Sequence, residues 1–88
     1  MRPTMHHFRI SVIRTDALFV STLQPSDEPS AAQVRAAVAA ATGEFGRRGC
    51  AELVAHEFGD HPEIAVSRME WARRIVRASY PSPDHQQL

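Results

Sequence analysis

Residues 60–80, DHPEIAVSRMEWARRIVRASY, form the stretch that decides the fold. This is the longest strongly patterned segment, and it holds the only tryptophan. Drawn as a helix, it places one line of apolar side chains along its length: Ala65, Met69, Ala72, Val76 and Tyr80. A second set flanks that line, with Val66 on one side and Ile64, Trp71 and Ile75 on the other. Because a surface helix needs an apolar stripe of only about 100°, this wider arc predicts a helix packed on two sides or one that keeps an apolar surface for a partner.

Length and charge limit what the chain can be. At 88 residues it is predicted to form one domain. Ten acidic residues balance ten arginines, so no overall field attracts nucleic acid or an anionic membrane. The charges are nevertheless segregated, with three arginines and no acid in residues 1–15, and seven acids against three arginines in residues 16–60. This distribution indicates complementarity within the chain, or two copies that meet head to tail.

The cellular environment is predicted from what the sequence lacks. A single cysteine excludes an internal disulfide, and the apolar run 17–20 is far too short to cross a bilayer. Asp16 interrupts the pattern of a signal peptide. We therefore expect a cytoplasmic protein without a membrane segment.

The N-terminal region carries the one β-strand pattern of the sequence. Residues 8–13 alternate in the manner of a half-buried strand, so residues 1–15 are predicted to be a leader or a short extended segment. Asp16 suits the N-cap of a short helix over 17–23, which Pro25 would stop. A hairpin pairing 8–12 with 18–23 is the alternative, but Thr-Asp is a poor hairpin turn.

Two further helices are expected between Pro25 and the stretch 60–80. Ser30 and Gln33 have the spacing of a capping box, and one apolar stripe follows: Val34, Val38, Ala41 and Phe45. Gly43 or Gly46 would end this helix. The next helix is expected over 49–58, with one apolar face made of Cys50, Leu53, Val54 and Phe58.

The last helix is predicted to begin at a well-specified joint. Gly59 ends the preceding helix, Asp60 and Glu63 have capping-box spacing, and Pro62 is tolerated in a first turn. The fold prediction is an all-α bundle of about four helices, with or without a short extended N-terminal segment. Residues 16–80 form the single helical domain, and 81–88 are expected to be a flexible tail.

No catalytic residue, metal site or cofactor is predicted. His56 and His61 are five residues apart, whereas the zinc motif HExxH needs two histidines four apart on one helical face. Cys50 and His56 lie about 120° apart around one helix, which prevents the direct hydrogen bond of a nucleophile and its base. Cys50 is therefore predicted to be a buried core thiol.

One local pattern resembles a known family. Leu53, Val54 and Ala55 followed by Gly59, and then the segment 66–70, are similar to the helix-turn-helix of phage repressors. In that resemblance 53–59 (Leu53–Gly59) is the first helix with its turn, and 62–77 (Pro62–Arg77) is the recognition helix. The resemblance implies these DNA-contacting residues: Ser67, Arg68, Arg73, Arg74 and Arg77.

The pattern departs from that family in spacing and in charge. Its apolar residues after Gly59 lie one position further along, so the turn would be one residue longer. Acids and arginines nearly cancel on the polar face, where Glu70 and Arg74 are predicted to pair, and a mixed face neutralises few phosphates.

Protein–protein contact is the preferred function. Aromatic residues beside arginine are enriched in the cores of interfaces. The predicted contact surface comprises Ile64, Arg68, Trp71, Arg74 and Ile75. Phe19 and Leu23 could instead cover Trp71 within one chain, and the sequence leaves that choice open. We expect a noncatalytic interaction or regulatory protein, self-associating as a homodimer or a subunit of a larger assembly. DNA binding is the alternative.

Overall fold

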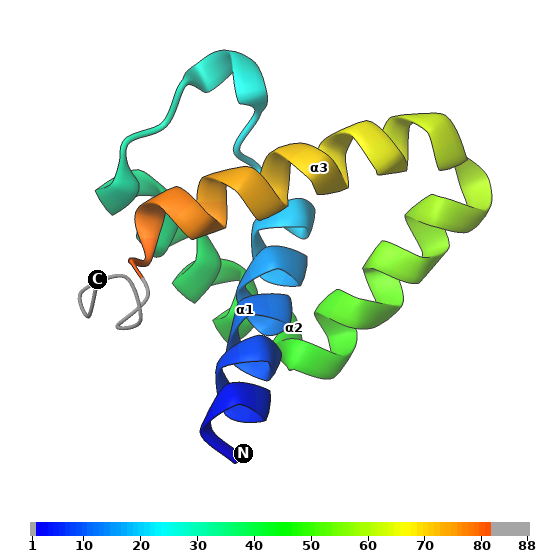
Figure 1. The fold of residues 1–88 in the computed structure, drawn as a ribbon. Helices are drawn as coiled ribbons and strands as arrows, with labels where there is room; N and C mark the ends of the chain where they lie inside the picture. The colour runs from blue at the N-terminus through cyan, green and yellow to red at the C-terminus, as the bar shows by residue number, and fades with distance from the viewer. Residues whose placement is uncertain (1, 82–88) are drawn as a thin grey trace.

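The chain folds into three α-helices and one 3₁₀ turn (Figure 1). The computed structural model describes residues 2–81, with side chains from residue 9 onward. Its elements are α1 (Arg2–Val20), η1 (Pro25–Asp27), α2 (Ala31–Asp60) and α3 (Pro62–Ser79). The all-helical prediction is confirmed within residues 2–81, where no strand occurs. Three helices replace the expected four because the second and third predicted helices run together as α2. Of the predicted tail 81–88, all but Pro81 lies outside the described residues.

The N-terminal prediction is wrong. Residues 2–20 form α1, so neither the extended segment, the hairpin nor an N-cap at Asp16 exists. The buried residues of α1 follow helical spacing: Thr15, Ala17, Leu18 and Phe19. Strand propensity is a weak preference, and packing of this helical face overrides the short alternating pattern. None of the helices in the described residues has the length and apolar character needed to cross a bilayer.

The start of α2 follows its capping box. The Ser30 hydroxyl accepts a hydrogen bond from the Gln33 backbone N–H at 3.1 Å, and the Gln33 side chain accepts one from the Ser30 N–H at 2.8 Å. Val34, Val38 and Ala41 are buried as the apolar stripe predicts. This prediction is therefore confirmed, and the N-terminal half of α2 enters the fold with its first amides satisfied.

A kink divides α2 at Gly46. Its backbone has φ 69° and ψ 164°, a conformation that is nearly restricted to glycine. Of the two glycines predicted to end this helix, Gly43 and Gly46, it is Gly46 that interrupts it. Phe45, which directly precedes the kink, is 40% exposed, so the prediction of Phe45 on the buried stripe is wrong. In Figure 1 the two halves of α2 form a V with the kink at the bottom.

The joint between α2 and α3 differs from its prediction. Gly59 and Asp60 lie inside α2, and His61 is the residue that precedes α3. The His61 side chain makes no capping hydrogen bond, so the predicted capping box of Asp60 and Glu63 is wrong. Pro62 does occupy the first turn of α3, where its missing N–H has no helical partner.

α3 crosses α1 (Figure 1) and supplies more buried apolar residues to the shared core than either of the other two helices. The central line of α3 is buried as predicted: Ala65, Met69, Ala72 and Val76. Ala17 of α1 and Ala65 and Ala72 of α3 are fully buried, and such small side chains let two helices approach closely. Cys50 of α2 and Leu18 of α1 complete this cluster. The core therefore lies where all three helices meet.

Candidate functional site

Trp71 is buried within the chain. It is 6% exposed and belongs to the same core cluster as Phe19. The Arg68 guanidinium lies over both rings, with its central carbon 5.0 Å from the Trp71 ring centroid and 5.8 Å from that of Phe19. Phe58 stacks on Phe19 from α2, with 6.0 Å between the ring centroids. The alternative that the sequence left open is thereby resolved: side chains of the same molecule cover Trp71.

Arg68 is occupied at the C-terminal end of α1. Its Nε donates to the Phe19 carbonyl oxygen at 2.6 Å, and its Nη2 donates to those of Leu23 at 2.8 Å, Ser21 at 3.1 Å and Leu18 at 3.4 Å. A cation at a helix C-terminus complements the helix dipole and satisfies carbonyls that have no partner within the helix. Burial lowers the pKa of Arg68, while the nearby Glu57 carboxylate opposes that shift. Arg68 therefore holds α1 to α3.

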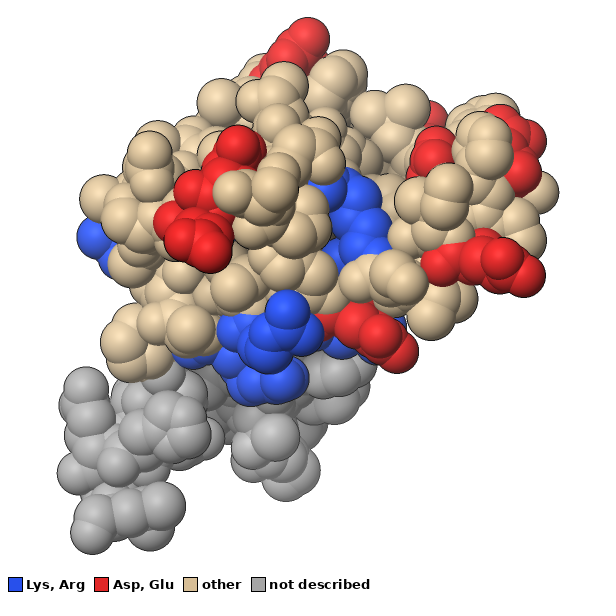
Figure 2. Space-filling model, turned by 90° about the horizontal axis from the view of Figure 1, so that it is seen from above, with Lys and Arg blue, Asp and Glu red and all other residues tan. Residues whose placement is uncertain are grey.

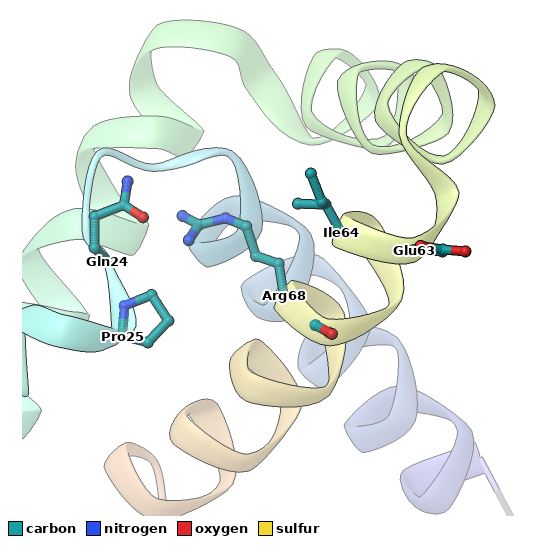
Figure 3. Close-up of a pocket in the computed structure, with 6 residues that line it drawn as sticks. Gln24, Pro25, Glu63, Ile64 and Arg68 are labelled. Atoms are coloured by element: carbon teal, nitrogen blue, oxygen red, sulfur yellow. The ribbon is translucent and has the colours of Figure 1, made fainter.

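An open groove lies beyond the end of α1. It comprises two adjoining hollows of about 460 and 340 Å³, which share Gln24, Ile64 and Arg68. Figure 3 shows Gln24 and Pro25 on one side, Ile64 on α3 opposite them, and the Arg68 side chain reaching across between the two sides. Leu53 of α2 lines the second hollow. Ile64 is 63% exposed and Leu53 39%, so the groove presents apolar surface to solvent.

Both walls of this groove are acidic. The loop 21–30 carries two acids and no arginine, and residues 49–67 carry four acids and no arginine. Of these acids, Glu57 and Glu63 line the hollows directly. Figure 2 looks onto this end of the molecule and shows acidic side chains on either side of a hollow that contains basic atoms. We call this feature, with its apolar residues Leu53 and Ile64, the acidic groove.

The predicted contact surface is only partly assembled here. Ile64 and Arg68 line the acidic groove, whereas Trp71 is buried, Ile75 is half-buried against the core and Arg74 is exposed outside the groove. Leu53, Glu57 and Gln24 line the groove although the sequence does not predict them for a contact surface. The helical spacing of Leu53 places it on a core stripe instead, and the excess width of the apolar arc on α3 is the one signal that points to the groove.

The residues implied by the helix-turn-helix resemblance do not share one surface. Ser67 and Arg68 line the acidic groove, whereas Arg73 and Arg77 line a separate hollow of about 310 Å³ beside α1. His61 alone separates α2 from α3, while the turn of a helix-turn-helix has three or four residues. The joint between α2 and α3 thus lacks the longer turn that the resemblance requires.

Ion pairs between the segregated charges are also missing from the described residues. The one pair that forms there joins His61 Nδ1 and Glu57 Oε2 at 3.2 Å. The predicted pairing of Glu70 with Arg74 is wrong, because no such contact forms. Between described side chains, complementarity therefore does not extend to direct contacts between arginines and carboxylates.

Cys50 is the core thiol that the sequence predicted. It is 1% exposed, and its Sγ donates to the Ala41 carbonyl oxygen at 3.8 Å. Burial, and then the nearby Asp16 carboxylate, raise the pKa of this thiol. A protonated, buried thiol is a poor nucleophile. Among the described residues no three His, Cys, Asp or Glu side chains are grouped so as to hold a metal ion.

Comparison with known proteins provides no functional lead, since no family model, curated protein or solved structure matches the chain. Function has to be inferred from the geometry of the acidic groove.

Proposed function

We propose that this chain is a noncatalytic interaction protein that binds another protein through the acidic groove. The supporting observation is Ile64, which is 63% exposed on the wall of an open groove although the chain buries Met69, Trp71 and Val76 of the same helix. Contiguous exposed apolar surface rimmed by polar residues is typical of an interaction site, and Ile64 shares the groove with the exposed Leu53. The protein is expected in the cytoplasm, as a self-associating molecule or as a subunit of a larger assembly.

The contact surface differs from the one centred on Trp71. Trp71 contributes stability, and Arg68 positions the end of α1 that forms one wall of the groove. The residues expected to contact a partner are Leu53, Glu57, Glu63 and Ile64. Apolar contact would supply affinity, and the carboxylates would select a basic partner and raise its association rate.

Affinity capture from the native lysate tests this proposal with two matched variants. Ile64→Asp places a charge in the groove, whereas Val66→Asp places the same charge on a neighbouring apolar residue, 47% exposed, outside the residues that line the groove. We expect wild type and Val66→Asp to retain the same bound proteins and Ile64→Asp to lose them. Identical protein sets on all three baits would refute the proposal. Circular dichroism confirms that both variants remain helical.

A further inference from the structure

We infer that the partner in the acidic groove is a second copy of this chain, which inserts the kink of α2. This inference rests on the proposed function, because it names the occupant of the same groove. The kink carries an exposed aromatic residue, Phe45, followed by Arg47 and Arg48, and both arginines are exposed. It therefore combines apolar surface with positive charge, the chemistry that the groove would bind.

The groove and the kink of α2 carry charges of opposite sign. Glu57 and Glu63 line the groove, and four further acids lie in the flanking segments 21–30 and 49–67. The one lining arginine, Arg68, already donates to four carbonyl oxygens of residues 18–23. Neither Arg47 nor Arg48 forms an ion pair with a described carboxylate. Glu44 adds one negative charge near the kink, so residues 43–49 have a net charge of +1. A positively charged kink and a groove lined by carboxylates in one molecule favour contact between copies.

Other basic surfaces fit the groove less well. Arg73 and Arg77 of α3 share a hollow with Asp16, whose carboxylate Arg73 attracts, and the exposed apolar residue there is Val12, which is smaller than Phe45. A contact needs an apolar anchor to gain affinity, because exposed ion pairs alone contribute only about 0–1 kcal/mol. Phe45 is such an anchor, and only Gly46 separates it in sequence from two arginines.

The positions of the two sites determine the type of assembly. In Figure 1 the kink lies in the lower part of the molecule, above the N-terminal end of α1, whereas η1 and the start of α3, which line the groove, lie in the upper part. Two different surfaces at opposite ends make a heterologous contact, which adds copies head to tail instead of closing a symmetric dimer. Each added copy leaves one free groove and one free kink.

Sedimentation velocity from micromolar to millimolar concentration tests the inference. We expect the weight-average sedimentation coefficient of the wild type to rise with concentration beyond the value of a dimer. Salt is expected to reduce this rise, because exposed charges are screened. A wild-type chain that stays monomeric, or one that stops at a dimer, would overturn the head-to-tail inference.

Two complementary variants sharpen the test. Ile64→Asp blocks the groove and leaves the kink intact. The double substitution Arg47→Glu with Arg48→Glu reverses the charge of the kink and leaves the groove intact. Each variant alone should remain monomeric, and an equimolar mixture should form a one-to-one complex and nothing larger. All three altered residues are exposed, so the fold is expected to survive. A mixture that stays monomeric would contradict the inference.

Controls separate this inference from the proposed function. Val66→Asp and Arg74→Glu alter exposed residues outside both sites and should associate as the wild type does. If the wild type stays monomeric but loses a captured protein on Ile64→Asp substitution, only the self-association inference fails. If Ile64→Asp changes neither association nor capture, the proposed function fails as well.

Discussion

Trp71 and Ile64 are both large apolar residues of α3, two turns apart, and the fold treats them in opposite ways. Trp71 is 6% exposed, beneath Arg68 and in one cluster with Phe19, whereas Ile64 is 63% exposed. The difference arises because α1 ends at Val20, and the hollow beyond its end is the one that Ile64 lines. α3 therefore packs against the core along most of its length, whereas its first turn exposes apolar surface that a partner could contact.

The largest effect on stability is expected when Trp71, the buried residue of the two, is truncated. Trp71→Ala should lower the free energy of unfolding by about 3–5 kcal/mol, because it removes a large core side chain and leaves a cavity. Ile64→Ala, on a residue already mostly in water, should change it by less than about 0.5 kcal/mol. Urea denaturation followed by circular dichroism measures both. If Trp71→Ala is too unstable to purify, Trp71→Phe should show an intermediate loss. Equal effects at the two positions would contradict the comparison.

Arg68 connects the two regions, and its removal should have the next largest effect. Arg68→Met should destabilise the fold by about 2 kcal/mol, because the carbonyls at the end of α1 lose their donor. Arg68→Lys keeps the charge but not the planar set of donors, so an intermediate loss is expected. Arg74→Met is the exposed control and should leave the urea midpoint unchanged. A midpoint for Arg68→Met equal to that of wild type would refute this role.

The kink at Gly46 should matter less for stability. Gly46→Ala forces a side chain into φ 69° and ψ 164°, at a cost of about 1–2 kcal/mol. Gly43→Ala, in the helix three residues earlier and with no atom near its added methyl group, should instead stabilise by about 0.5–1 kcal/mol. Thermal melting of the two variants gives the comparison. Shifts of the same sign would show that the kink does not depend on glycine.

The smallest effect is expected at Asp16, on the core side of α1. Burial raises the pKa of this carboxyl, while Arg73 opposes the shift. A folded-state pKa above the unfolded value, about 3.9 for aspartate, means that the native state binds the proton more tightly. The stability contribution of Asp16 is therefore greatest below that pH and is lost as the pH rises through the folded-state pKa.

The variant Asp16→Asn tests whether the charged Asp16 carboxylate lowers the stability of the fold at neutral pH. At neutral pH the variant should melt slightly above the wild type, because an uncharged amide is less costly to bury than a carboxylate. Below the unfolded pKa of aspartate the two proteins should have the same melting temperature. Two titratable groups lie close enough to interact with this carboxylate, namely the guanidinium of Arg73, which attracts it, and the thiol of Cys50, whose pKa it raises. A variant that melts lower than wild type at neutral pH would show that attraction to Arg73 outweighs burial.

Local signals were sufficient for several elements. The capping box at Ser30 and Gln33, the buried line of α3 and the core thiol Cys50 were all predicted from spacing and residue type. Residues 2–20 were not, because a short alternating pattern is compatible with either a strand or a helix until a neighbouring surface selects one face. Likewise Asp60 had the right residue type and spacing for a cap, yet α2 continued through it.

By itself, the sequence determined the all-α fold class, a wide apolar arc on the last helix, and the separation of acidic from basic segments. These follow from periodicity and composition, which are local properties. Only the tertiary structure decided which part of the arc is covered. Arg68 caps α1 across an interval of about fifty residues, and the end of α1 leaves Ile64 on an open groove. Contacts over such separations depend on how helices pack, which no local pattern encodes.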